Sequence, residues 1–456
     1  MSERFELETE LSRDLKLTHA TAIVVGAIIG SGIFGAPAGI ADALRSPGLF
    51  LIFWIIGGVL AFCGALSMAE LGAMMPRSGG PLVYLREAFP PYVAFFYGWM
   101  DVFLMQAGGI AAGTAIFASY LGYFVPWISP ESMVFVAGPW KVSTELLTVY
   151  ATLLLLGTVN YVGVRFGGAL AMLTSVGKVA ALVGFAVLAF FGRDSERVIE
   201  WFPAREGIDP LASFGMAMVG VFFAYNGWQY LNIVAGEVEN PRRNLPLSII
   251  IGLSIVTLVY FFVNGAYLSA LTIDEIAASN RVAADAAERV LGPAGGVFVS
   301  VAVLISTFGV VNNTILWAPR VAYGMSREKL FFPSFSFVHP RFRTPSRAIV
   351  GIVLCSAVWS SLGSFQAIID SFAFALAGFL LLTVIALFVL RRKFPDAHRP
   401  FKVWGYPYVP MFFVVVTSGY VVSVFVFKAA ESLPGLLFLL LGVPVYFFWF
   451  RKRSEA

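Results

Sequence analysis

The feature that most constrains this chain is a series of long apolar stretches that recurs from one end to the other. A helix needs about 20 apolar residues to cross the hydrocarbon core of a bilayer. Hydrophobic residues make up 59% of the 456 residues and charged residues 13%, with a mean hydropathy of +0.82. Soluble domains average about 45–50% and about 25%, so the sequence predicts an integral membrane protein.

These stretches are continuously apolar rather than alternating, which predicts helices instead of a β-barrel, because every backbone group in hydrocarbon needs an internal partner. The expected fold class is an all-α integral membrane protein with about twelve transmembrane helices. The predicted segments are residues 18–43, 48–75, 91–120, 146–163, 168–191, 211–236, 247–271, 288–322, 347–365, 368–390, 408–428 and 433–450.

The distribution of Lys and Arg residues predicts the orientation, because cytoplasmic loops collect these residues. With both termini in the cytoplasm, 22 of the 31 fall on the cytoplasmic side and 8 on the outer side, and Lys178 alone lies within a segment. Residues 1–17 carry charges of both signs and lack the basic region of a cleavable signal peptide. We therefore expect both termini in the cytoplasm.

The net charge of +4 follows from this orientation, so no nucleic-acid partner is expected. Cys63 and Cys355 fall within apolar segments, where buried free thiols are expected. The three His residues lack the spacing of a zinc site. The sequence therefore predicts no metal and no cofactor.

Two of the predicted helices contain interruptions. Residues 26–37, GAIIGSGIFGAP, place Gly30, Ser31 and Gly32 within the first segment, and residues 225–227, Tyr-Asn-Gly, interrupt the sixth. Irregular backbone at membrane depth is tolerated only where protein or a water-filled cavity satisfies it. Interruptions at corresponding positions of two halves indicate a transporter built from inverted repeats; close helix packing through glycine is the alternative.

The two interruptions lie five segments apart, which predicts two inverted repeats of five helices each. The first repeat would cover residues 18–191 and the second residues 211–390, with residues 408–450 forming two additional helices. Residues 1–17 and 451–456 would be cytoplasmic tails.

A pair of helix breaks offers binding groups for a zwitterion. The N-terminus of a half-helix exposes N–H groups that suit a carboxylate, and the C-terminus of the facing half exposes carbonyls that suit an ammonium. We expect the N–H groups of Ser31, Gly32 and Ile33, with the Ser31 hydroxyl, to bind the α-carboxylate of an amino acid. The carbonyls expected to bind its α-amino group are those around Ile28, Phe223 and Asn226.

Lys178 lies too far from either end of its segment to reach water easily, and a cation inside the membrane indicates a function. Its expected partners are the carbonyls near Gly30 and the hydroxyls of Ser306 and Thr307. An ammonium there would take the place of the sodium ion in sodium-driven transporters, which predicts sodium-independent transport. The alternative is a lysine that faces a polar cavity without a mechanistic role.

Glu70 and Asp101 are the other candidate charges. Glu70 lies near the cytoplasmic end of its segment, where structural pairing is favoured over proton transport. Asp101 lies deeper, and the two readings stay open. Because burial disfavours an ionised carboxyl, a proton-coupled mechanism remains an alternative.

Five motifs of this chain resemble those of a known family, and the match covers most of the chain, from about residue 15 to about residue 425. The chain is similar to the L-type amino-acid transporter family of the amino acid/polyamine/organocation superfamily, most of all to bacterial serine/threonine and alanine/serine/cysteine exchangers. The motifs are GAIIGSGIFGAP (26–37), AELGAMMPRSGGPLVYL (69–85), Lys178, FAYNGWQYLN with EVENPRRNLP (223–246) and GMSREKLFFPSFSFVHPRFRTPSRA (324–348).

This resemblance implies a LeuT-like fold of twelve helices, with helices 1 and 6 unwound, and a sodium-independent amino-acid exchanger that works by alternating access. Phe223 resembles the aromatic gate that covers the bound amino acid, and Lys178 matches the family lysine. The family's substrate contacts fall here on Ile28, Ser31, Gly32, Phe223 and Asn226.

Asn226 and Gln229 depart from the family pattern. Asn226 stands where members mostly carry Gly, Asp or Ser, and its amide offers hydrogen bonds without charge. Neutral amino acids of small to medium size are therefore the expected substrates. Gln229 stands where the large-neutral transporters carry Asn, in the expected distal part of the substrate site.

A third departure concerns partners. Eukaryotic members join a glycoprotein heavy chain through a cysteine in the outer loop between helices 3 and 4, and residues 122–145 contain no cysteine. We expect a stand-alone protein, monomeric or weakly dimeric, in a bacterial cytoplasmic membrane.

Other functions remain open from the sequence. They are a proton-coupled amino-acid permease, a cationic amino-acid or amine antiporter, and a sensor that binds an amino acid without moving it. A membrane enzyme is disfavoured, because no paired His or carboxylate constellation lies near either break.

Overall fold

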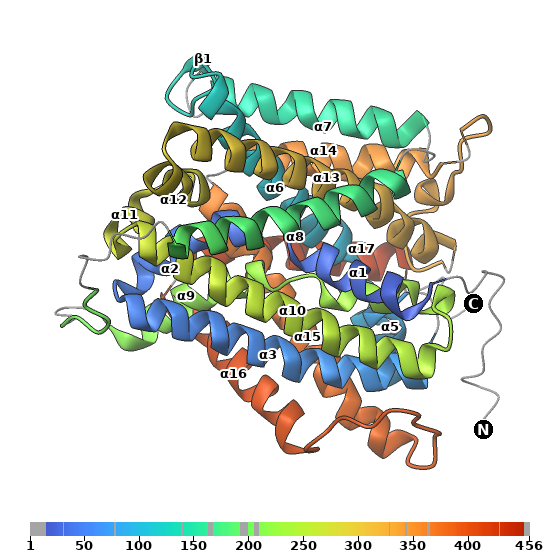
Figure 1. The fold of residues 1–456 in the computed structure, drawn as a ribbon. Coiled ribbons are helices and arrows are strands. Elements are labelled where there is room, and N and C mark those ends of the chain that lie inside the picture. Colours follow the sequence, from blue (N-terminus) through green and yellow to red (C-terminus); the bar gives the residue numbers. More distant parts are fainter. Residues whose placement is uncertain are drawn as a thin grey trace.

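The computed structural model describes residues 15–450 except Ser31 and residues 77–78, 138–139, 163–166, 192–198, 205–208, 328, 343, 363–364 and 428. Long helices run side by side in one bundle (Figure 1). Helix α1 (Leu17–Ile28) starts at one end of this bundle, and the small elements β1 (Met133–Ala137), α11 (Ile273–Ala278) and α12 (Val282–Leu291) lie at the other. The predicted outer loops therefore share one end.

Seven helices of the described chain are long and apolar enough to cross a membrane. The pair α1 and α2 (Gly32–Leu44), bent by 43° at its break, makes an eighth if it is counted as one span. The seven are α3 (Pro47–Met74), the continuous run α5, η2 and α6 (Pro91–Met100, Asp101–Gln106 and Ala107–Phe124), α7 (Thr144–Val162), α10 (Pro241–Ala270), α13 (Pro293–Arg327), residues Ala375–Lys393 of α15 (Phe365–Lys393) and residues Tyr408–Val426 of α16 (Tyr408–Phe427).

Four shorter apolar helices coincide with the remaining predicted segments. They are Gly177–Phe190 in α8 (Gly167–Phe191), α9 (Pro210–Ala224), α14 (Ser346–Leu362) and Gly435–Phe448 in α17 (Ala429–Val445) and η5 (Tyr446–Phe450). The all-α membrane class is confirmed, while the number of twelve crossings and the two repeats stay predictions.

The sixth predicted segment, residues 211–236, is not one regular helix. Helix α9 ends at Ala224, a turn follows, and the 3₁₀-helix η3 covers Trp228–Glu237. Gly227 in this turn has a φ of +132°, which side chains with a Cβ rarely adopt.

Several small elements escaped the hydropathy pattern. Strands β1 and β2 (Trp140–Ser143) pair antiparallel, and α4 (Pro81–Ala88) and η4 (Pro333–Ser336) are short. Helix α11 begins with a capping box, in which Thr272 accepts from Glu275 N–H and Glu275 accepts from Thr272 N–H. The bond from Thr272, followed by the Arg289 guanidinium, lowers the pKa of Glu275.

The elements around the two interruptions pack closely. Helix α10 packs against α1 and α3, α2 packs against α9, and α8 packs against α10 and α13. Both interrupted helices therefore lie inside the bundle, with α3, α8 and α10 around them.

Glu70 has the structural role that the sequence favoured. Its carboxylate is fully buried and accepts two hydrogen bonds from Arg391, at 2.8 and 2.6 Å, and a third from the Val403 N–H at 2.8 Å. Arg399 Nε lies 3.5 Å from the same carboxylate. The bidentate pair thus joins the end of α3 to the end of α15.

We expect Glu70→Gln to lower the thermal unfolding midpoint of the purified protein. Removing one partner of a buried ion pair costs about 3–5 kcal/mol, because the remaining charge is left uncompensated. Asp396→Asn, in the exposed loop beside the cluster, is the matched control and should leave the midpoint unchanged. Equal midpoints for the two variants would contradict this role of Glu70.

Candidate functional site

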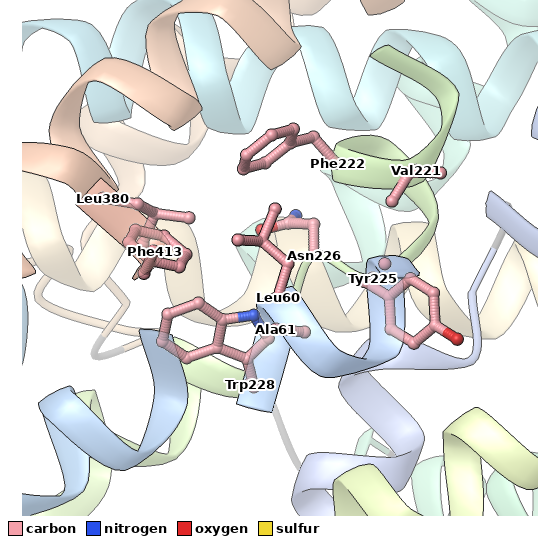
Figure 2. Close-up of a pocket in the computed structure, with 10 residues that line it drawn as sticks. Leu60, Ala61, Val221, Phe222, Tyr225, Asn226, Trp228, Leu380 and Phe413 are labelled. Atoms are coloured by element: carbon pink, nitrogen blue, oxygen red, sulfur yellow. The ribbon is translucent and has the colours of Figure 1, made fainter. Parts of the chain in front are cut away.

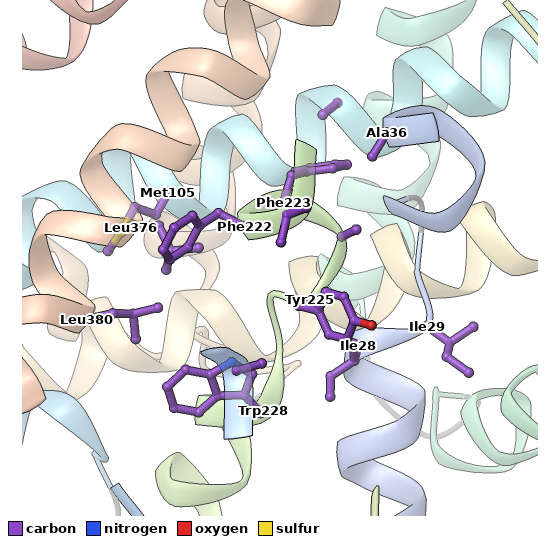
Figure 3. Packing of buried hydrophobic residues seen from close by; sticks show 14 of the residues in the cluster. Ile28, Ile29, Ala36, Met105, Phe222, Phe223, Tyr225, Trp228, Leu376 and Leu380 are labelled. Atoms are coloured by element: carbon purple, nitrogen blue, oxygen red, sulfur yellow. The ribbon is translucent and has the colours of Figure 1, made fainter. Parts of the chain in front are cut away.

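The two interruptions meet at one buried point. Helix α1 ends at Ile28 and α2 begins at Gly32, and a Cβ added to Gly32 would lie 2.5 Å from Ala224 Cα at the end of α9. A Cβ added to Gly227 would lie 2.7 Å from the Ala27 carbonyl. Figure 3 shows the end of α1 and the end of α9 in this region. Close backbone contacts therefore require glycine at both Gly32 and Gly227.

Tyr260 of α10 joins the two breaks. Its hydroxyl lies 2.9 Å from the Ile28 carbonyl and 3.0 Å from the Ala224 carbonyl, at the C-terminal ends of α1 and α9. The last carbonyls of a helix have no intrahelical partner, and one fully buried tyrosine places its single hydroxyl hydrogen within reach of both ends.

An aromatic cluster holds Tyr260 in place. The rings of Trp54 and Tyr225 contact the Tyr260 ring with centroid distances of 5.4 and 5.1 Å, both edge to face. Tyr225 also donates a hydrogen bond of 2.8 Å to the Trp54 carbonyl. Helices α3, α9 and α10 thereby fix the position of the hydroxyl that bridges the two breaks.

Lys178 donates to the end of α1. Its ammonium lies 2.7 Å from the Gly26 carbonyl, and the residue is 6% exposed. A cation is favoured there, because the C-terminus of a helix carries a partial negative charge. The contact is thus at Gly26, one turn before the predicted Gly30.

The two hydroxyls that were predicted to contact Lys178 are not its hydrogen-bond partners. The Thr307 hydroxyl donates to the Val303 carbonyl of its own helix, and the buried Ser306 hydroxyl has no partner among the described residues. Lys178 and Val303 instead line one small cavity together with Phe34. The lysine joins α8 to α1 rather than to the hydroxyls of α13.

The N–H side of the break belongs to α2. Gly32 and Ile33 open this helix and are buried, so their N–H groups fall in the first turn, where a helix offers no acceptor. Ser31, the third predicted carboxylate ligand, lies outside the described residues. The described positions therefore provide N–H groups at one end of the break and carbonyls at the other.

Asn226 and Gln229 bind each other. Gln229 Nε2 donates to Asn226 Oδ1, Gln229 Oε1 accepts from the Gly227 N–H at 3.1 Å, and Asn226 Nδ2 donates to the Tyr230 hydroxyl at 3.2 Å. The two amides hold the turn in shape, yet each amide nitrogen keeps a second hydrogen for another acceptor.

An apolar cavity adjoins Asn226. It is small, with space for about one water molecule, and α3, α9, α15 and α16 supply its walls (Figure 2). Phe222 and Trp228 line it, whereas Phe223, the predicted gate, is a buried residue just before the break. The lining residues are Gly57, Leu60, Ala61, Val221, Phe222, Tyr225, Asn226, Trp228, Leu380 and Phe413.

Sequence reasoning missed Tyr260 and Trp54, and it placed Tyr225 in the interruption without assigning a partner to its hydroxyl. A signal was present, because a tyrosine in the middle of an apolar segment must find a partner for its hydroxyl. Nothing in the sequence indicates that the partners of Tyr260 are the two helix ends.

A helical membrane bundle that brings the ends of two interrupted helices together at one buried point has the architecture of a secondary transporter. Comparison with known families identifies the transporter family. The sequence model of the family described as amino acid permease matches residues 15–447, and the chain belongs to this family.

Characterised relatives cover nearly the whole chain. The serine/threonine exchanger SteT of Bacillus subtilis (strain 168) is 30% identical over 98% of this chain and 98% of the relative. The b(0,+)-type amino acid transporter 1 of Mus musculus is 32% identical over 96% of this chain and 88% of the relative. The cystine/glutamate transporter of Homo sapiens is 30% identical over 98% and 89%. The predicted resemblance is confirmed, and the protein is an amino-acid transporter rather than an enzyme.

We expect Gly32→Val to reduce transport at least about tenfold, equivalent to about 1.4 kcal/mol, because the new Cβ would collide with Ala224. Uptake of labelled amino acids into proteoliposomes measures the effect. Gly419→Ala in α16 is the matched control, since a Cβ there would meet no atom within 4 Å. Undiminished uptake by Gly32→Val at an equal protein level would contradict the importance of this contact.

Proposed function

We propose that this transporter exchanges neutral L-amino acids of small to medium size across the membrane, by alternating access and without sodium. The observation that carries the proposal is the meeting of α1, α2 and α9 around Gly32 and Ala224. The first turn of α2 would bind the α-carboxylate, and the carbonyls at the ends of α1 and α9 would bind the α-amino group.

The neutral substrate class follows from the side chains beside the break. Asn226 and Gln229 are uncharged, and their amides bind each other. A cationic substrate side chain would lack an ionised partner there, whereas a hydroxyl or a small apolar group would match the remaining hydrogen-bond capacity of Asn226. The apolar cavity beside Asn226 supports the same class.

Lys178 supports the proposed sodium independence. Its ammonium already lies against the Gly26 carbonyl at the end of α1. A second cation close to it would be repelled in a medium of low dielectric constant. In this proposal the lysine supplies the positive charge that a coupling ion would otherwise bring.

The proposal includes a stand-alone protein in a cell membrane with both termini in the cytoplasm. The outer loop of residues 122–145 contains no cysteine for a disulfide-linked heavy chain. Both cysteines are free thiols within helices: Cys63 is buried in α3, as predicted, and Cys355 is half-buried in α14.

Counterflow in proteoliposomes tests the proposed function. Vesicles loaded with unlabelled serine, alanine or threonine should accelerate the uptake of labelled serine equally in sodium and in choline medium. Vesicles loaded with arginine or agmatine should not. Exchange of labelled arginine without exchange of the neutral amino acids would contradict the substrate class, and a need for sodium would contradict the ion independence.

Lys178→Ala should slow exchange about tenfold or change its asymmetry between the two sides. A hydrogen bond from a charged group contributes about 1.5–3 kcal/mol, and its loss would leave the Gly26 carbonyl without this donor. Initial rates of exchange in both directions provide the measurement. Unchanged rates in both directions would reduce Lys178 to a structural residue.

A further inference from the structure

Asp101 is a buried carboxyl that the proposed function does not use. The residue is 3% exposed and lies in the middle of the run α5, η2 and α6. Its Oδ1 accepts a hydrogen bond of 2.8 Å from Gln106 Nε2. Its Oδ2 is buried and has no hydrogen-bond partner among the described residues. Oδ2 of this carboxyl can therefore bind a further group, such as a proton.

A π-helix creates this arrangement. The segment η2 runs from Asp101 to Gln106, and the five-residue spacing of a π-helix brings these two side chains together. Single turns of π-helix inside α-helices are frequent at functional sites. The unusual backbone and the unpartnered oxygen thus occur at the same residue.

The surroundings of Asp101 offer no compensating cation. Segment η2 packs against α5, α6, α13, α14 and α15. The titratable side chains that interact electrostatically with Asp101 in the described part of the chain are Tyr97 of α5 and Tyr230 of η3, both neutral phenols. None of the ion pairs observed among the described residues includes Asp101. An ionised, unpaired carboxylate is costly in such a place, whereas a proton on Oδ2 removes the charge.

A line of neighbouring polar side chains leads from Asp101 to the break in helix α9. Gln106 contacts both Asp101 and the Tyr230 hydroxyl. The Tyr230 hydroxyl accepts from Asn226 Nδ2 at 3.2 Å, and Asn226 lies in the turn that follows α9. A change in the charge of Asp101 would alter which hydrogens Gln106 and Tyr230 present, and hence the orientation of the Asn226 amide.

We propose that Asp101 is a proton-binding site coupled to the amino-acid site through Gln106, Tyr230 and Asn226. A proton from water forms an O–H bond at Oδ2 and returns to water when the carboxyl ionises. The coupling rests on the proposed function, because it acts on Asn226. Exchange of neutral amino acids then depends on pH through one titrating group, although sodium plays no part.

The test is the pH dependence of serine counterflow, with equal pH on both sides of the vesicle, between about pH 5 and about pH 9. The wild-type initial rate should change by up to about tenfold per pH unit on one side of a single transition. Asp101→Asn, which copies the neutral carboxyl in shape, should lose this transition. A flat wild-type profile, or a wild-type profile in Asp101→Asn, would overturn the proposal.

Two further variants separate coupling from structure. Tyr230→Phe keeps Asp101 but interrupts the line of polar side chains to Asn226, so its counterflow should also lose the transition; this variant decides the question if Asp101→Asn does not fold. Thr114→Val is the matched control on the same run of helix, because the Thr114 hydroxyl donates only to carbonyls of its own helix. Its profile should follow the wild type.

Infrared difference spectroscopy of the purified protein detects the protonated carboxyl directly. The carbonyl band of a protonated carboxyl should be present in the wild type, respond to pH and be absent in Asp101→Asn. If the wild type showed no serine counterflow at any pH, the proposed function would be contradicted. The carbonyl band would still report whether Asp101 binds a proton. Absence of the band in the wild type at the lowest pH would overturn the proton site independently of transport.

Discussion

The carbonyl oxygens at the ends of α1 and α9 are the groups on which the rest of the site depends. In hydrocarbon, each backbone group without a partner costs several kcal/mol, so a helix can be interrupted only where donors are provided. Tyr260 supplies one hydroxyl to two helix ends, and Lys178 supplies an ammonium to a third carbonyl. Both donors come from helices distant in sequence, which explains why α8 and α10 must pack against the break.

The same carbonyls have a second requirement in a transporter, because the site must be stable both with and without its cargo. A carbonyl oxygen has two lone pairs. The Ile28 carbonyl already accepts from the Gly30 N–H at 2.7 Å and from Tyr260. A substrate ammonium would therefore share or displace a protein donor rather than fill an empty place. This exchange of donors gives a physical reason for a link between substrate binding and the geometry of the break.

Sequence patterns predicted the features that depend on local chemistry. Apolar length located the membrane helices, and the glycines around Gly32 and Gly227 located the irregular backbone, because both signals are carried by neighbouring residues. The partner of Lys178 and the two carbonyls beside Tyr260 depend on how distant helices pack. Hydropathy does not describe such packing, so the contact of Lys178 with Gly26 and the contacts of Tyr260 with two helix ends could be found only in the structure. The pairing of Asn226 with Gln229 and the π-helix at Asp101 are local, but they depend on backbone geometry that hydropathy does not describe.

Glu70 and Asp101 show why burial alone does not assign a role to a membrane carboxyl. Both are almost completely buried. Glu70 accepts three hydrogen bonds, two of them from a guanidinium, and its charge is thereby compensated. Asp101 accepts one hydrogen bond from a neutral amide. The first carboxyl is compensated as an anion and fixes two helix ends, whereas the second has no cation beside it among the described residues, and a proton on Oδ2 would remove its charge. The set of donors around a buried carboxyl, rather than its depth, separates a structural charge from one that can change.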